Sequence, residues 1–99
     1  MPRPRRCRRI SNKPKITYFK PAGIPIRILK EVKITYVELE ALRLKDYMKL
    51  DQQKAAEKMD ISQPTFHRLV LKARKKIAKA LLEGKAIRVE GGNFKFFKD

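Results

Sequence analysis

Three polar side chains near the middle of the chain are of the types that recognise nucleobase edges. Gln63, His67 and Arg68 follow one another closely in the sequence. A glutamine amide can donate to and accept from adenine, and an arginine guanidinium donates two parallel hydrogen bonds to guanine. If one helix carries these residues on its leading turns, we expect them to contact base edges. For His67 the alternative is an ordinary surface residue.

Hydroxyl and ammonium groups surround these residues and suit contacts with phosphates. A straight helix leaves the curved groove of a duplex as it lengthens, so residues beyond its first turns meet the sugar-phosphate backbone. These residues would set position and affinity rather than base preference. The expected phosphate-binding residues are Ser62, Thr65, Lys72 and Lys75.

The N-terminus offers a second kind of contact, through arginines interleaved with prolines. Pro2 and Pro4 disfavour a helix and keep this segment extended. Arginines on an extended arm suit a narrow minor groove, where the negative potential is concentrated. The alternative is a basic tail with unspecific attraction to DNA. The arginines of this arm are Arg3, Arg5, Arg6, Arg8 and Arg9.

The charge of the whole chain points to a polyanionic partner. Lys and Arg number 26 against 10 Asp and Glu, which gives a formal net charge of +16 in 99 residues. This charge is far beyond what solubility requires. It is also uneven, because residues 1–34 contain eleven Lys and Arg residues and one acid, Glu31.

Several function classes are excluded or disfavoured. No apolar run approaches the roughly 20 residues needed to cross a bilayer, and no apolar segment follows the basic N-terminus, so we expect a cytoplasmic, nucleoid-associated protein. Cys7 is the only cysteine and His67 the only histidine, too few ligands for a structural zinc site. No Ser-His-acid constellation is evident. We expect no enzyme activity, metal or cofactor.

Capping signals predict three helices between residues 35 and 84. Thr35 and Glu38 form a capping-box pattern, so the first helix should begin at Tyr36. Asp51 is the expected N-cap of a short second helix that ends at Met59. A third helix should begin after Ser62, with Pro64 in its first turn, and end at Gly84.

The third helix is expected to separate core from charge. At about 100° per residue, its apolar residues fall on one side and its cations on the other. The expected core side comprises Phe66, Leu69, Val70, Ala73, Ile77, Ala80 and Leu81. The expected solvent side comprises Pro64, Arg68, Lys72, Lys75 and Lys79.

The flanking segments complete one compact domain. We expect residues 1–34 to form a basic, Pro-rich arm, and the β-branched and aromatic residues at 16–19 are compatible with a short strand. Residues 85–99 are expected to form a β-hairpin, with strands at 86–90 and 94–97 around Gly91, Gly92 and Asn93. This hairpin should pack on the helices or pair with residues 16–19. We therefore expect a mainly α fold with a three-helix core at 35–84.

Residues 52–71 fit a helix-turn-helix unit, and the wider sequence resembles a known family. Ala56 is small where the two helices would cross, and Ile61 can fill the turn. The motifs that carry the resemblance are CRRI, YFKPAGIP, VELEALRLKD, AAEKMDISQPTF, ARKKIAKAL and GKAIRVEGGNF. They are similar to those of an uncharacterised prokaryotic family of predicted DNA-binding proteins. The helix-turn-helix of that family resembles region four of bacterial sigma factors.

The resemblance implies DNA binding with a transcriptional role. Together with the charge, it predicts a small regulator that reads double-stranded DNA through the major groove with the helix that starts at Ser62. The oligomeric state is left open, and a homodimer is one alternative, because dimers are common for this motif. Two alternatives remain open: an RNA-binding module, and an adaptor that docks on RNA polymerase.

Overall fold

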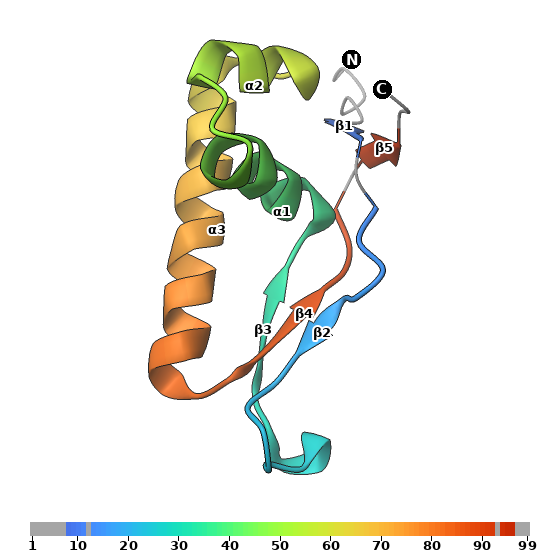
Figure 1. The fold of residues 1–99 in the computed structure, drawn as a ribbon, viewed down its shortest axis with the longest axis vertical. Helices are drawn as coiled ribbons and strands as arrows, with labels where there is room; N and C mark the ends of the chain where they lie inside the picture. Colours follow the sequence, from blue (N-terminus) through green and yellow to red (C-terminus); the bar gives the residue numbers. More distant parts are fainter. Residues whose placement is uncertain (1–7, 12, 93, 97–99) are drawn as a thin grey trace, which may run out of the picture.

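The computed structural model describes residues 8–11, 13–92 and 94–96. The described chain forms a mixed fold of three α-helices and two small sheets (Figure 1). The helices are α1 (Tyr36–Leu42), α2 (Gln52–Lys58) and α3 (Gln63–Glu83), with a 3₁₀ turn η1 (Ile26–Ile28) and a π-helical turn η2 (Arg43–Tyr47). The strands are β1 (Arg8–Ile10), β2 (Tyr18–Phe19), β3 (Glu31–Ile34), β4 (Ala86–Val89) and β5 (Phe94–Phe96).

All three predicted helix starts are confirmed by their caps. The Thr35 hydroxyl accepts from the Glu38 amide at 3.1 Å, and the Glu38 carboxylate accepts from the Thr35 amide at 3.0 Å. Asp51 and Ser62 cap α2 and α3 through their side chains. Gly84 ends α3 in the left-handed conformation, with φ of 66°. Local hydrogen bonding therefore sets the boundaries of the helical region.

The predicted C-terminal β-hairpin is wrong. Strand β4 lies between β2 and β3, antiparallel to the first and parallel to the second, while β5 pairs in parallel with β1. Both edges of β4 are therefore occupied. Gly91 and Gly92 instead pass the start of α1, where the Tyr36 amide donates to the Gly91 carbonyl at 3.1 Å. A Cβ on Gly92 would lie 3.2 Å from the Cβ of Thr35, so this close passage favours glycine.

The described part of the N-terminal third is built into the sheets and is not a free arm. The predicted strand at 16–19 appears as β2, and its pairing with β4 confirms the expected partner. Strand β3 was not predicted. Its residues alternate between exposed and buried, with Val32 and Ile34 inward, and this alternation is the signal that a strand pattern leaves in a sequence.

Helix α3 runs along one side of the molecule, beside α1, β3 and β4 (Figure 1). The long axis measures 44 Å, with α2 at one end and the turn η1 at the other. The core gathers where the three helices and β1 meet. Its buried members are Ile10, Val37, Ala41, Leu44, Ala55, Ala56, Met59, Phe66 and Val70.

The faces of α3 agree with the predicted pattern except at its C-terminal end. Phe66, Val70, Ala73 and Ala80 are buried, as expected. Leu81 was also expected in the core, but 73% of its surface is exposed. It lies in the last turn of the helix, where it borders an open hollow with Phe19 and Ile87 rather than the packed core. A helical period alone does not show where the neighbouring elements end.

Candidate nucleic-acid interface

A tight turn, residues 59–62, joins α2 to α3 and sets how the two helices meet. Asp60 adopts a left-handed conformation with φ of 57°, which Asp tolerates better than most residues. The Ile61 amide donates to the Ala56 carbonyl at 3.1 Å, and the Arg9 amide donates to the Met59 carbonyl at 3.1 Å. The turn is thus fixed from both α2 and β1.

Beneath the turn, tightly packed apolar residues hold the first turns of α3 in place. Ala55, Met59 and Phe66 are fully buried, and Ala56 is nearly so. Alanine at two adjacent positions of α2 allows its backbone to approach α3 closely, and Phe66 fills the space below. The outer side chains of α3 are therefore presented on a rigid support.

All three predicted base-reading residues are exposed at this end. Gln63 and His67 line a shallow hollow together with Gln52 and Pro64. Arg68 does not line that hollow, and its guanidinium donates to the Thr65 hydroxyl at 3.4 Å. The structure thus brings Gln63 and His67 together and places Arg68 further round the same helix.

Two outward residues were missed from the sequence. Gln52 is the first residue of α2, as Gln63 is the first residue of α3, and each follows a side-chain cap. The signal in the sequence was that a capping residue is followed by Gln at the start of both helices. Leu71 is 47% exposed on the otherwise cationic side of α3, where a helical-wheel count would place it. An exposed apolar side chain there suits the methyl group of thymine.

The predicted phosphate-binding residues divide into two groups. Ser62 and Thr65 are engaged with each other, since the Ser62 hydroxyl donates to the Thr65 hydroxyl at 2.9 Å and accepts from its amide at 3.3 Å. Lys72 and Lys75 are exposed. The lysines are therefore extended into solvent, whereas the hydroxyls shape the first turn of the helix.

The cations of α3 fall into two groups, those that form ion pairs with neighbouring elements and those that do not. The Arg74 guanidinium donates to Asp46 at 2.6 and 2.9 Å, and the Lys76 ammonium donates to the nearly buried Glu38 at 2.6 Å. Asp46 and Glu38 thereby neutralise the cations that face η2 and α1. Within the described ranges, no carboxylate lies at ion-pair distance from the cations of the outer side. This cationic face comprises Arg68, Lys72, Lys75 and Lys79.

The pKa values of the Arg74–Asp46 pair shift in the directions that keep both groups charged. The hydrogen bond from Arg74 lowers the pKa of the Asp46 carboxyl, and the same hydrogen bond raises the pKa of Arg74. Both shifts favour the charged forms of the two groups, so each neutralises the other. The positive potential of the helix comes from its cationic face.

The predicted arginine arm lies largely outside the described residues. This holds for Arg3, Arg5 and Arg6. Arg8 and Arg9 belong to β1, paired with Phe94 and Lys95 of β5. These two arginines are therefore held in a sheet next to the turn at 59–62, and their backbone is not available to follow a groove.

Two features are absent from the part of the chain that the structure describes. No group of three or more His, Cys, Asp or Glu side chains is arranged to hold a metal ion. No helix in the same ranges combines the length and the apolar composition required to cross a bilayer.

Comparison with known proteins places the chain among close relatives. The family model described as "Protein of unknown function DUF134" matches residues 1–97. UPF0251 protein DET0218 of Dehalococcoides mccartyi is 57% identical over 94 residues, which cover 95% of this chain and 80% of the relative. UPF0251 protein TTE1845 of Caldanaerobacter subterraneus is 55% identical over 97 residues, covering 98% and 82%. No solved structure matches the chain.

Proposed function

The chain belongs to the DUF134 family, and we propose that this member binds double-stranded DNA in a sequence-specific manner as a small transcription regulator. In this proposal, α2, the turn at 59–62 and α3 act as a helix-turn-helix unit. The first turns of α3 enter the major groove, as the second helix of such units does.

The observation that carries the proposal is the division of α3 into two sides. One side packs Phe66, Val70 and Ala73 into the core. The other is the cationic face, whose four cations form no ion pair with a described carboxylate, in a chain with a net charge of +16. A helix divided in this way can pack against its own domain with its apolar side. Its cations then face outward, where they attract the phosphates of a polyanion.

Base recognition would fall to the polar residues at the start of α3. Gln63 would pair with adenine and Arg68 with guanine, each through two hydrogen bonds that a different base pair would not offer. Gln52 and His67 border the same hollow as Gln63 and would contact the flanking base or phosphate. The fixed turn beneath them favours discrimination, because a rigid support holds the donors in register.

Phosphate contacts would supply most of the affinity. Lys72, Lys75 and Lys79 lie further along the cationic face, where the helix leaves the groove. The arginines of residues 1–7 would add contacts in a neighbouring minor groove. With about eight phosphates neutralised, the logarithm of the binding constant should fall with the logarithm of salt concentration at a slope of about −7.

Selection of bound fragments from random and genomic DNA at physiological salt tests the proposal. We expect enrichment of one defined motif and tight binding to a duplex that carries it. Uniform recovery of all fragments would contradict the sequence-specific part and indicate an architectural protein. An excess of structured RNA that displaces the selected duplex would instead favour the RNA-binding alternative, and capture of RNA polymerase without DNA would favour the adaptor.

A further inference from the structure

The segment between β2 and β3, residues 20–30, forms a structured tip at the end of the molecule remote from α2 (Figure 1). The Lys20 ammonium donates to the carbonyls of Pro21 and Ile24 at 3.1 and 2.7 Å, which closes the turn at residues 20–24. The Ile28 amide donates to the Pro25 carbonyl at 3.2 Å in the turn η1. The tip therefore has a defined shape rather than the character of a loose loop.

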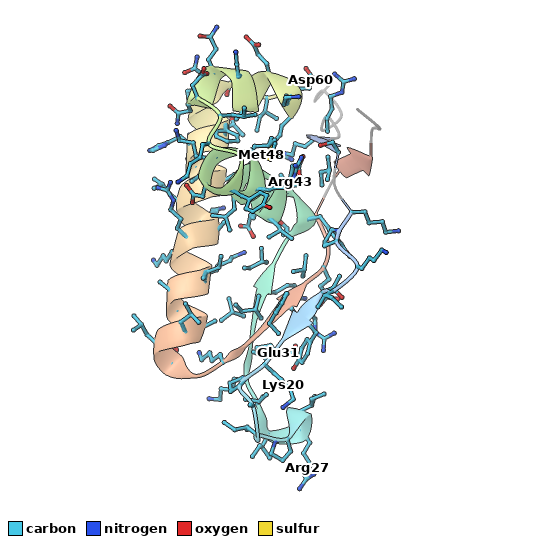
Figure 2. All side chains as sticks on the ribbon, viewed as in Figure 1. Lys20, Arg27, Glu31, Arg43, Met48 and Asp60 are labelled. Atoms are coloured by element: carbon cyan, nitrogen blue, oxygen red, sulfur yellow. The ribbon has the colours of Figure 1, made fainter. Side chains whose placement is uncertain are left out.

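Apolar and cationic side chains alternate on this tip. Ile26 and Ile28 are 57% and 66% exposed. Arg27 lies between them and points outward at the extreme end of the molecule (Figure 2), and Lys30 is exposed as well. Two large aliphatic side chains with this exposure gain little from folding, because most of their apolar surface stays in water and is free to be buried against a partner.

The charge of the tip is not balanced locally. Glu31 is the only acid of residues 1–34. Its carboxylate accepts from the Arg88 guanidinium at 3.0 and 2.8 Å, and it is thus engaged on the sheet. Lys20, Arg27 and Lys30 consequently form a second basic surface, separate from the cationic face of α3.

The residues expected to read bases and the tip lie toward opposite ends of the molecule, whereas the cationic face runs along α3 as far as Lys79, four residues before the helix ends. The hollow at Gln63 and His67 includes Gln52 of α2. Arg27 marks the other end of the molecule, whose long axis measures 44 Å (Figure 2). If the first turns of α3 read the bases, the groove contacts are centred at the α2 end, and Arg27 at the extreme of the tip lies far from them. If the tip also binds nucleic acid, its partner is another duplex or a distant part of the same DNA.

We propose that the tip is a second DNA-binding site, which contacts the minor groove and lets one chain bridge two duplex segments. Proteins that bind the minor groove commonly place Arg or Lys along it and insert apolar side chains between base steps. Arg27 and Lys30 would contact the groove and its phosphates, and Ile26 or Ile28 would form the apolar wedge. This inference rests on the proposed function, because it assumes that the α2 end holds the first duplex.

A two-duplex capture assay tests the proposal with the full chain. One selected duplex is immobilised, and capture of a second, fluorescent duplex is measured at physiological salt in the presence of protein. Two tip variants are compared with the wild type: Arg27→Ala/Lys30→Ala and Ile26→Ser/Ile28→Ser. The control variant Lys13→Ala/Lys15→Ala removes the same charge from the exposed segment before β2.

We expect the wild type and the control to capture the second duplex, and each tip variant to capture about tenfold less. Affinity for a single duplex, measured by fluorescence anisotropy, should change by less than about twofold in the tip variants. Far-UV circular dichroism melts verify folding, which these exposed positions should preserve.

Three results would overturn the proposal. The first is a wild type that binds one duplex tightly and captures no second. In that case only the bridging proposal fails, whereas absence of binding to any duplex removes the proposed function as well. The second is equal capture by tip variants and wild type. The third is dissociation of a wild-type dimer by the tip substitutions in analytical ultracentrifugation, which would make the tip a contact between copies of this chain.

Discussion

The guanidinium of Arg74 holds both carboxylate oxygens of Asp46, at 2.6 and 2.9 Å, and so joins the middle of α3 to the π-helical turn η2. This pair removes one cation from the surface beside the cationic face. In a chain with so large a net charge, such neutralisation decides which side of the helix attracts a polyanion. The cations of the cationic face make no ion pair with a described carboxylate, and they remain available to phosphate.

The neutralising role of Asp46 can be tested directly. Asp46→Asn should raise affinity for unselected duplex DNA and steepen its salt dependence by about one phosphate contact, because Arg74 becomes available. Arg74→Gln should change DNA binding little. The coupling between the two positions in a double-mutant cycle of urea unfolding should stay below about 1 kcal/mol, since both side chains are partly exposed. Reduced DNA affinity in Asp46→Asn would contradict this view of the pair.

Packing beneath the turn makes Phe66 the most sensitive position of α3. Phe66→Ala should lower the free energy of unfolding by about 3–5 kcal/mol, because a fully buried ring leaves a cavity at the junction of α2 and α3. Leu81→Ala is the matched control on the same helix. It should cost less than about 0.5 kcal/mol, because most of the Leu81 side chain is already in water. Chemical denaturation gives both values, and a cost at Leu81 equal to that at Phe66 would show that Leu81 is covered in solution.

The helical part of the fold could be predicted from the sequence because its signals are local. The side chains that cap a helix act within three or four residues, so Thr35, Asp51 and Ser62 mark helix starts wherever the rest of the chain lies. The buried and exposed sides of α3 also followed from its period. The cationic face was therefore predictable, although the ion pairs that neutralise Arg74 and Lys76 beside it were not.

The strand pairing could not be predicted, because it depends on partners far apart in the chain. Gly91 and Gly92 have the composition of a hairpin turn, but β4 finds its neighbours in β2 and β3. Nothing local indicates that both edges of β4 are already occupied. The same limit applies to the tip at 20–30, whose exposure depends on where the sheet ends, and to the hollow that brings Gln52 beside Gln63.

Acid should weaken the sheet through Glu31. The hydrogen bond from Arg88 lowers the pKa of the Glu31 carboxyl to about 2, from an ordinary value of 4.5. A lowered pKa means that the folded state prefers the ionised carboxylate, so this contribution is complete above about pH 4.5 and is lost as the pH falls toward 2. Glu31→Gln removes the titrating group. Thermal melts from pH 6 to pH 2 should therefore show a smaller decline in Tm for this variant than for the wild type.

The sign of that difference distinguishes the pair from general acid unfolding. Other carboxyl groups with lowered pKa values, those of Asp46 and Glu83, titrate in both proteins and so contribute to both declines. A variant with an equal or steeper decline would show that the Glu31–Arg88 contact does not stabilise the folded state. Arg88→Met removes the other partner of the pair and gives a second comparison with the wild type. Its effect also includes the loss of the cation that lies 4.7 Å from the centre of the Tyr18 ring.

The assigned roles on α3 predict different changes in base preference for two cations. Arg68→Ala should lose discrimination at one base position of the selected motif, at a cost of about 1–3 kcal/mol for the preferred base, because its two hydrogen bonds to guanine disappear. Lys75→Ala should weaken binding to all sequences alike and reduce the salt slope by about one, because it removes a phosphate contact. Both side chains are exposed and neither lies within ion-pair distance of a described carboxylate, so neither substitution should unfold the protein. Binding to a panel of single-base variants of the motif, repeated at several salt concentrations, separates the two effects. The reverse pattern, with uniform weakening at Arg68 and relaxed base preference at Lys75, would mean that the middle of α3 rather than its first turns faces the bases.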